Sequence, residues 1–310
     1  MNGTTRPCTY LRTVVTTRCP MSCSYCHYEG DQQRPGTRNQ LAPEALSACL
    51  AIAATRGIRK FKFLGGEPLV YRDLPRVVAD LRAVARSADL SVISAGVTLR
   101  GLLQDCLGAG LDRVNVSIHG YGYDAFARRG GSVVMWHQRN AFLEEVIDAG
   151  RPLKLNFVLA DQAEIADLGE LLAWAAGRPV TVNVLDDLRA DDASAQGVIE
   201  VLRALRGPEA LQVREPDPDS LETAHLHWRD GLRVEVKDER LGDLAPWRAC
   251  TGCPARARCR EGIFALRLTH DGRLQACMDR PDLSLDLVGV LQRDGREAAT
   301  KAWDAFVAGL

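Results

Sequence analysis

The feature that most constrains the fold is an alternation of short apolar runs with helical patterns between residues 11 and 207. Strands are expected at 11–17, 60–66, 90–96, 112–120, 153–160 and 180–187. Helices are expected at 41–57, 74–87, 99–110, 138–149, 166–177 and 194–207. Repeated strand–helix units predict a parallel sheet with helices outside it. Six units are too few to close an eight-stranded barrel, so we predict an α/β fold with a partial (β/α)6 TIM-like barrel.

Three cysteines follow the first expected strand directly. Cys19, Cys23 and Cys26 have the spacing C-x3-C-x2-C, and the whole chain holds ten cysteines in 310 residues. This density is too low for a disulfide-stapled scaffold, and the N-terminal segment has no apolar run that could act as a secretory signal. We therefore expect a cytoplasmic protein with reduced thiols, in which clustered cysteines bind metal or catalyse. The absence of an 18-residue apolar stretch and the net charge of −1 predict no membrane span and no general attraction for nucleic acid.

Two kinds of metal site are open to this loop. Zinc needs four ligands, and His27 could supply the fourth, although the adjacent positions of Cys26 and His27 suit one small ion poorly. An iron–sulfur cube is large enough to take three thiolates from a short loop. Three cysteines would leave one iron open for a small molecule, so the sequence favours the cluster.

The cysteine loop resembles that of the radical S-adenosylmethionine (SAM) enzymes, and the "GGEP" of Gly65, Gly66, Glu67 and Pro68 resembles the second motif of that superfamily. The resemblance implies that the three cysteines ligate a 4Fe-4S cluster whose open iron binds SAM. It also implies that carbonyls around Gly65–Glu67 receive the SAM ammonium and that Ser117 contacts the SAM carboxylate. Such enzymes take an electron from a donor such as flavodoxin or ferredoxin, and the 5′-deoxyadenosyl radical then removes hydrogen from the substrate.

A second cysteine set lies in the last third of the chain, at Cys250, Cys253, Cys259 and Cys277. Two β-hairpins are expected beside it, with Asp-Gly turns at 230–231 and 271–272. We expect residues 1–210 to form the barrel and residues 211–310 to form a small β-hairpin and cysteine module. Four cysteines could bind zinc. Resemblance to the auxiliary "twitch" module of radical SAM enzymes implies a second 4Fe-4S cluster instead, in which Cys250 either ligates iron or lies free as a hydrogen-atom donor.

Residues 10–300 resemble the GTP 3′,8-cyclases of molybdopterin biosynthesis, in the loop end "CHYEG", the strand "LDRVNVSI" and the second hairpin. Arg12, Lys154 and Arg267 match substrate-facing positions of that family, which implies a site for an anionic or polar ligand. The sequence also departs from the family. It offers four cysteines in the second set where the family has three, it has Ala265 where the family has an arginine, and it ends in "FVAGL" where the family ends in Gly-Gly.

These departures predict a relative with a different substrate. We expect a small polar metabolite, such as a nucleotide, sugar or aminocyclitol of specialised metabolism, which undergoes oxidation, epimerisation or rearrangement. A peptide substrate is the alternative, and it is disfavoured because 310 residues leave little room for a leader-binding domain. Two further alternatives are GTP cyclase activity itself and a non-catalytic iron–sulfur or zinc protein, which the intact motifs disfavour.

Several remaining side chains are secondary candidates. A thiol could return a hydrogen atom in an epimerisation, and Cys8, Cys49 and Cys106 are left over for that role. Cys49 and Cys106 fall in expected helices, where a buried cysteine ordinarily serves packing. His27, His119 and Tyr123 are expected near the mouth of the barrel, and His119 is expected to be a packed or hydrogen-bonded residue rather than an acid or base.

Overall fold

The structure is a computed structural model that describes residues 8–21, 23, 26, 40–98, 101–118, 120–159, 164–186, 195–215, 222–238, 247–254, 256, 259 and 264–310. Its first six strands are β1 (Tyr10–Thr16), β2 (Lys60–Gly65), β3 (Asp89–Ser94), β4 (Arg113–Ser117), β5 (Leu153–Leu159) and β6 (Val180–Asp186). Each of these strands pairs in parallel with the next one along the chain. The helices that alternate with them are α1 (Pro43–Thr55), α2 (Leu74–Val84), α3 (Leu102–Gly108), α4 (Tyr123–Arg128), α5 (Val133–Asp148), α6 (Glu164–Ala175) and α7 (Ala195–Arg206).

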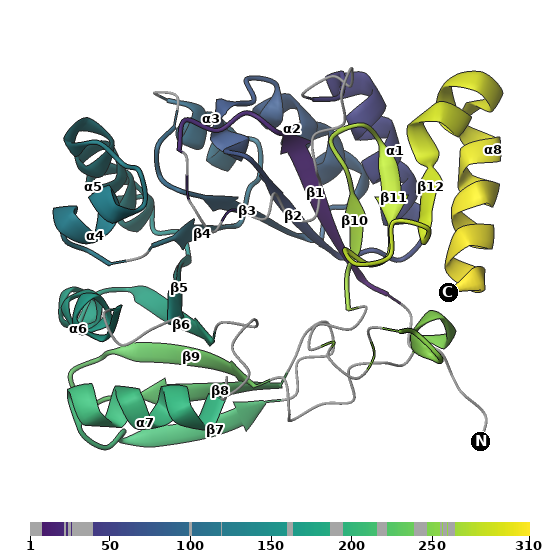
Figure 1. Ribbon diagram of the computed structural model, residues 1–310. Coiled ribbons are helices and arrows are strands. Elements are labelled where there is room, and N and C mark those ends of the chain that lie inside the picture. The colour runs from purple at the N-terminus through teal and green to yellow at the C-terminus, as the bar shows by residue number, and fades with distance from the viewer. Residues whose placement is uncertain are drawn as a thin grey trace.

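The strands form one open sheet with the order β12-β11-β10-β1-β2-β3-β4-β5-β6-β9-β8-β7. Figure 1 shows this sheet curving from β10 and β1 round to β9 and β8, with α1, α2 and α3 on the outer side of the first strands. The predicted α/β class and partial (β/α)6 barrel are thereby confirmed. The carboxyl ends of β1 to β6 lie at one edge of the sheet, which is where such folds carry their chemistry.

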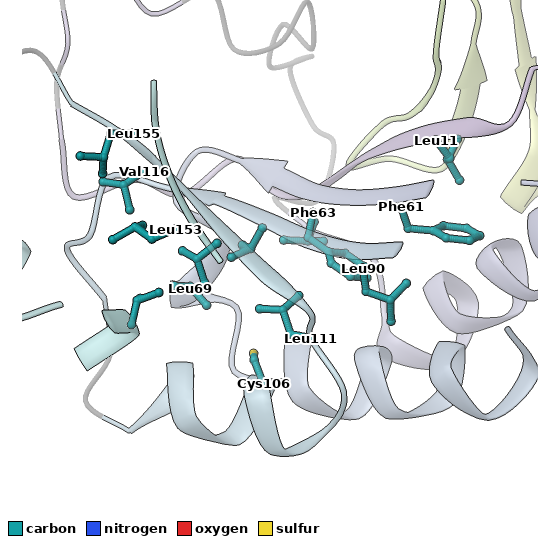
Figure 2. Close-up of a cluster of buried hydrophobic side chains, with 14 of the residues drawn as sticks. Leu11, Phe61, Phe63, Leu69, Leu90, Cys106, Leu111, Val116, Leu153 and Leu155 are labelled. Atoms are coloured by element: carbon teal, nitrogen blue, oxygen red, sulfur yellow. The ribbon is translucent and has the colours of Figure 1, made fainter. Parts of the chain in front are cut away.

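The core lies between the strands and the surrounding helices. Leu11, Phe61 and Leu90 are register partners on β1, β2 and β3, and none of them is exposed to solvent. Figure 2 shows these side chains among the residues that face the helices. Each such side chain contributes roughly 1.5–3 kcal/mol to folding by leaving water. Because side chains alternate along a strand, the neighbouring residues Arg12 and Lys62 face the inner side of the sheet.

The C-terminal part of the chain adds strands to both edges of this sheet. Strands β7 (Leu211–Glu215), β8 (Glu222–His227) and β9 (Arg233–Asp238) extend it beyond β6, where β9 runs parallel to β6. Strands β10 (Leu266–Leu268), β11 (Arg273–Gln275) and β12 (Ser284–Asp286) extend it beyond β1. The expected hairpins β8–β9 and β10–β11 are confirmed, with Gly231 and Gly272 in the left-handed region of their turns. The division at residue 210 stays a prediction.

The last helix, α8 (Leu287–Gly309), packs against α1 and covers β11 and β12. Gly295 interrupts it with a φ of 82°, so the segment consists of two helical pieces. Among the described residues, no helix is both long enough and apolar enough to cross a membrane.

Candidate active site

The end of β1 and the loop after β2 are held together by backbone hydrogen bonds. The N–H of Gly66 donates to the carbonyl of Thr16 over 2.8 Å, and the N–H of Glu67 donates to the carbonyl of Arg18 over 2.8 Å. Arg18 immediately precedes Cys19. The two motifs recognised in the sequence are therefore joined directly at the carboxyl ends of neighbouring strands.

The double glycine is required by this close approach. A Cβ atom on Gly65 would lie against the carbonyl oxygen of Thr16, and one on Gly66 against that of Arg18, closer than real Cβ atoms approach such groups. Gly65 also has a φ of 151°, which residues with side chains rarely adopt. The glycines thus leave a cradle of bare backbone beside the entry to the cysteine loop.

The three cysteines of the first loop lie close enough to influence one another electrostatically. Cys19 and Cys26 are exposed and Cys23 is half-buried. Although part of Cys19 is exposed, neighbouring protein atoms desolvate its thiol and raise its pKa to about 11, and smaller contributions come from the charges of Glu67, Cys23 and Cys26. Bound iron would reverse this shift, because a coordinating thiol is deprotonated. Three soft thiolates beside a bare backbone cradle fit an iron–sulfur cluster that leaves one iron open.

A single metal ion is a different case. Within the ranges that the structure describes, no three His, Cys, Asp or Glu side chains are gathered as the ligands of one ion. A cube of four irons spreads its ligands over four metal atoms, so its thiolates need not converge on one point. His27, the fourth ligand considered for zinc, lies outside the described residues, so this alternative remains untested.

Glu67 has a structural role that the sequence motif did not reveal. Its side chain is fully buried; Oε1 accepts from Leu69 N over 3.1 Å and from Ser94 Oγ over 2.8 Å, and Oε2 accepts from Ala95 N over 2.7 Å. Burial raises the pKa of this carboxyl to about 7, against the opposing effect of these three hydrogen bonds. Glu67 therefore ties the loop after β2 to the end of β3. Pro68 follows as the first residue of the short helix η2 (Pro68–Val70).

Ser117 is the last residue of β4 and the register partner of Asn156 on β5. Its position at a strand end places it at the same edge of the sheet as Gly65, the last residue of β2. Tyr123 begins α4, is 39% exposed and meets Trp136 edge to face. His119 lies outside the described residues.

Two of the three predicted substrate residues are neighbours on the inner side of the sheet. Arg12 on β1 is the register partner of Arg267 on β10 and, on its other side, of Lys62 on β2. We call Arg267, Arg12 and Lys62 the basic row. Lys62 was not predicted, although the alternation in "KFKF" places both lysines opposite the buried phenylalanines. Lys60 and Lys62 also lie over the ring of Tyr10, at 5.1 and 5.7 Å from its centre.

The third predicted residue, Lys154, has an acidic partner within the protein. Its ammonium forms an ion pair with Glu235 of β9, and the two side chains are 27% and 15% exposed. His225 of β8 lies 3.9 Å from the other oxygen of Glu235. Glu235 was not predicted, because the parallel pairing of β9 with β6 joins segments far apart in the sequence. Part of the Lys154 charge is thus balanced by the hairpin.

The four cysteines of the second set are half-buried in one region. Cys250 ends the short helix η3 (Arg248–Cys250), and the N–H of Cys253 donates to its carbonyl over 3.3 Å. Burial raises the pKa of Cys277, and the charge of Cys259 contributes further. Hydrogen bonds with Asp282 and then with Cys253 raise the pKa of Arg280, three residues after Cys277. These contacts bring the loop at 250–259 next to the segment that follows β11.

The leftover thiols differ in their surroundings. Cys49 and Cys106 are completely buried in the apolar core, and burial raises the pKa of each to about 12. They serve packing, as expected for helix cysteines. Cys8 is half-buried, with its Sγ 3.3 Å from the carbonyl of Tyr10 and 3.9 Å from that of Phe264.

The sequence matches a known protein family. The profile described as the Radical SAM superfamily matches residues 13–175, more than half of the 310-residue chain. A protein of Sulfurisphaera tokodaii named "Probable GTP 3′,8-cyclase" is 30% identical over 292 residues, which cover 92% of this chain and 85% of the relative. A protein of the same name from Methanopyrus kandleri is 30% identical over 306 residues, which cover 96% of this chain and 90% of the relative.

Comparison of structures agrees on the fold. The crystal structure of Streptococcus suis SuiB bound to S-adenosylmethionine superposes with a TM-score of 0.63 at 11% identity, covering 92% of this chain. The chain spans 66% of that protein's length, slightly under two thirds. At this identity the likeness concerns the fold alone. The sequence profile, the similar relatives and the joined strand-end motifs show that the chain belongs to the radical SAM superfamily, whose enzymes bind S-adenosylmethionine and a 4Fe-4S cluster.

Proposed function

We propose that this radical SAM enzyme acts on a small, polar, anionic metabolite. The observation that carries the proposal is the basic row, in which Arg267, Arg12 and Lys62 occupy neighbouring register positions on three adjacent strands. A ligand anion placed over the row would meet two guanidinium groups and one ammonium group from adjacent strands. A guanidinium pair also suits phosphate or carboxylate by its forked geometry.

The cofactor residues follow from the site. Cys19, Cys23 and Cys26 would hold the cluster, the backbone of Gly65–Glu67 would receive the SAM ammonium, Pro68 would start the turn that fixes this backbone, and Ser117 would meet the SAM carboxylate. When bound, the cluster and SAM supply one-electron cleavage of SAM and hydrogen-atom abstraction. The electron would come from a small carrier such as flavodoxin or ferredoxin. The surrounding protein fixes positions and keeps water from the reacting groups.

The second cysteine set would hold an auxiliary 4Fe-4S cluster. Cys250, Cys253, Cys259 and Cys277 supply one thiolate for each iron of a cube. Such a cluster has no iron left for substrate, so it would accept or pass an electron rather than bind the metabolite. Arg280, which contacts Cys253, would add a positive charge beside the thiolates.

The test is anaerobic incubation of the reconstituted protein with SAM and dithionite. We expect release of 5′-deoxyadenosine, and its loss in Cys23→Ala. Ser117→Ala should weaken SAM binding without removing iron. If the Cys23→Ala variant released 5′-deoxyadenosine as well as the unchanged protein does, the assignment of the first loop would be wrong.

The second candidate is the activity named for the relatives. It is favoured by about 30% identity over nearly the whole chain and by the matches at Arg12, Lys154 and Arg267. It is disfavoured by Ala265, which is 1% exposed, and by the ion pair that occupies Lys154. We expect poor use of GTP; conversion at about 1 per second or faster, a rate ordinary for enzymes, would establish the cyclase instead.

A peptide substrate has weaker support. SuiB has also been crystallised with its precursor peptide SuiA, and that structure superposes with a TM-score of 0.62. The identity is 12%, so the likeness concerns the fold and does not extend to the substrate.

A further inference from the structure

Arg139 of α5 is the largest completely buried side chain among the described residues, with 1% of its surface exposed. Arginine is almost never fully buried unless it is paired with an acid. Within the part of the chain that the structure describes, no carboxylate forms an ion pair with Arg139. Burial lowers the pKa of its guanidinium to about 10, which leaves the group positively charged at neutral pH.

The guanidinium of Arg139 donates hydrogen bonds to the segment that follows β4. Nη1 donates to the carbonyl of Gly120 over 2.9 Å and Nη2 to the carbonyl of Tyr121 over 2.6 Å. The opposite side is anchored by Asn140, whose Oδ1 accepts from Nε at 3.2 Å and from Nη2 at 3.0 Å. The ring of Phe126 lies 4.9 Å from the guanidinium carbon. These contacts fix the chain three and four residues beyond Ser117.

The stem of Arg139 touches the segment that follows β3. A Cβ atom on Gly96 would lie 3.0 Å from Cγ of Arg139, and Gly96 has a φ of 75°. Gly96 follows Ala95, whose N–H donates to Glu67. A continuous series of contacts therefore runs from the GGEP loop through the end of β3 to Arg139 and on to the end of β4.

A matching arginine serves the opposite ends of the same two strands. Arg82 of α2 donates from Nη1 to the carbonyl of Ala88, just before β3, and from Nη2 to the carbonyl of Gly110, before β4, each over 2.8 Å. Its Nη2 also donates to Oδ2 of Asp112 over 2.6 Å. Arg82 and Arg139 thus make the same kind of contact at the amino and carboxyl ends of β3 and β4.

We propose that Arg139 is a positioning residue for SAM, which fixes the segments after β3 and β4 relative to each other and so sets the separation between the GGEP loop and Ser117. The inference rests on the proposed SAM contacts at Gly65–Glu67 and Ser117. Among the described residues, the guanidinium of Arg139 donates to Gly120, Tyr121 and Asn140, so Arg139 acts through the backbone carbonyls that it holds. Burying a charge without an acid lowers the stability of the fold. In this site the buried guanidinium also fixes the spacing of the segments that contact the cofactor.

The experiment compares Arg139→Gln and Arg139→Lys with Arg82→Gln and Arg82→Lys in the reconstituted enzyme. SAM affinity is measured by anaerobic calorimetry on the oxidised cluster, and the melting temperature is measured on the same samples. We expect both arginines to contribute to stability, while Arg139→Gln, unlike Arg82→Gln, weakens SAM binding by about ten-fold or more, since small misplacements of binding groups have large effects. Lysine should restore part of the affinity at position 139, because its ammonium can still reach one carbonyl.

Two further variants keep the test decisive. Asn140→Ala leaves Arg139 in place but removes its anchor, so a smaller loss of SAM affinity is expected even if Arg139→Gln fails to fold. In a double-mutant cycle with Ser117→Ala, the effect of Arg139→Lys should shrink, because the two residues act through one contact.

The outcomes separate this inference from the proposed function. If the Arg139 variants bind SAM as the unchanged enzyme does, or if the Arg82 variants lose as much SAM affinity for the same fall in melting temperature, Arg139 only stabilises the fold. If Ser117→Ala leaves SAM binding unchanged, the proposed Ser117 contact fails first, and the cycle with Arg139 shows no coupling.

Discussion

Gly66 has no side chain, and the close backbone contact at the candidate site depends on this. The glycine lets the carbonyl of Arg18 pass where a Cβ atom would otherwise lie. A shift of the Arg18 backbone would also move Cys19, the next residue along the chain. The position of Cys19 therefore depends on Gly66 having no Cβ atom.

Gly66→Ala is expected to lower SAM cleavage about ten-fold or more, because the displaced backbone carries both the proposed SAM cradle and the first cysteine. The measurement is 5′-deoxyadenosine released under anaerobic reducing conditions. Gly108→Ala in α3 is the matched control, since nothing lies within 4 Å of its added Cβ. Equal activity of Gly66→Ala and the unchanged enzyme would show that the loop tolerates the shift.

Glu67 gives a prediction about pH. Burial raises its pKa from 4.5 to about 7, so the folded state binds the proton more tightly than the unfolded state does. The stability contributed by the protonated carboxyl is present below pH about 4.5 and is lost as the pH rises to about 7. Glu67→Gln cannot ionise and should lack this loss.

The difference in melting temperature between Glu67→Gln and the unchanged protein should therefore move in favour of the variant as the pH rises through that window. The variant will carry a constant penalty, because its amide cannot accept the hydrogen bond from both Ser94 and Ala95. A difference that does not vary with pH would mean that Glu67 keeps its charge throughout.

At the scale of helices and strands, the alternation in the sequence predicted all six barrel strands and the helices between them to within a few residues. Both Asp-Gly hairpins were also predicted, because their turns carry a strong local signal. The six-residue helix α4, the three-residue strand β12 and the interrupted helix α8 were missed. Short elements carry too few residues for a period, and Gly295 breaks the period of α8.

The amino end of α8 supplies a prediction at this scale. Asp286 caps the helix, with Oδ1 accepting from the N–H of Gly289 over 2.9 Å. Asp286→Ala should lower stability by about 1 kcal/mol, whereas Asp286→Asn should keep most of it. Thermal unfolding of the two variants measures the difference. If the two variants melted at the same temperature, below that of the unchanged protein, Asp286 would act through its charge rather than as a cap. Its partner would then be Arg293, whose Nη1 lies 3.7 Å from Oδ2 of Asp286.

At the scale of the whole molecule, the sequence predicted where the candidate site lies but not which residues surround it. The cysteine loop, the GGEP loop and Ser117 could be placed together because parallel strands end at one edge of the sheet. The ion-pair partner of Lys154 and the hydrogen-bond partners of Arg139 depend on which distant segments pair or pack. Such choices are non-local, so neither Glu235 nor Arg139 could be singled out from periodicity.

Metal content tests the arrangement of the two cysteine sets. Reconstituted protein should hold about eight irons, and the Cys253→Ala, Cys259→Ala double variant about four, while still cleaving SAM. A triple alanine variant at Cys19, Cys23 and Cys26 should also hold about four irons but cleave none. Recovery of zinc from the second set would disprove the auxiliary cluster.

Cys250→Ala decides whether the auxiliary cluster is fully ligated. We expect a changed cluster spectrum, because one iron would lose its thiolate. An unchanged spectrum combined with lost substrate turnover would make Cys250 a hydrogen-atom donor and leave an iron open.

The position of β10 beside β1 also bears on the order in which the protein can be made. Leu11 pairs with Leu266, so β1 acquires one of its two neighbours only after some 250 further residues have been synthesised. Until then, the strand that leads into the cysteine loop has one edge exposed, and such edges invite mispairing. Complete pairing of the strand that leads into the cysteine loop therefore depends on a segment some 250 residues further along the chain.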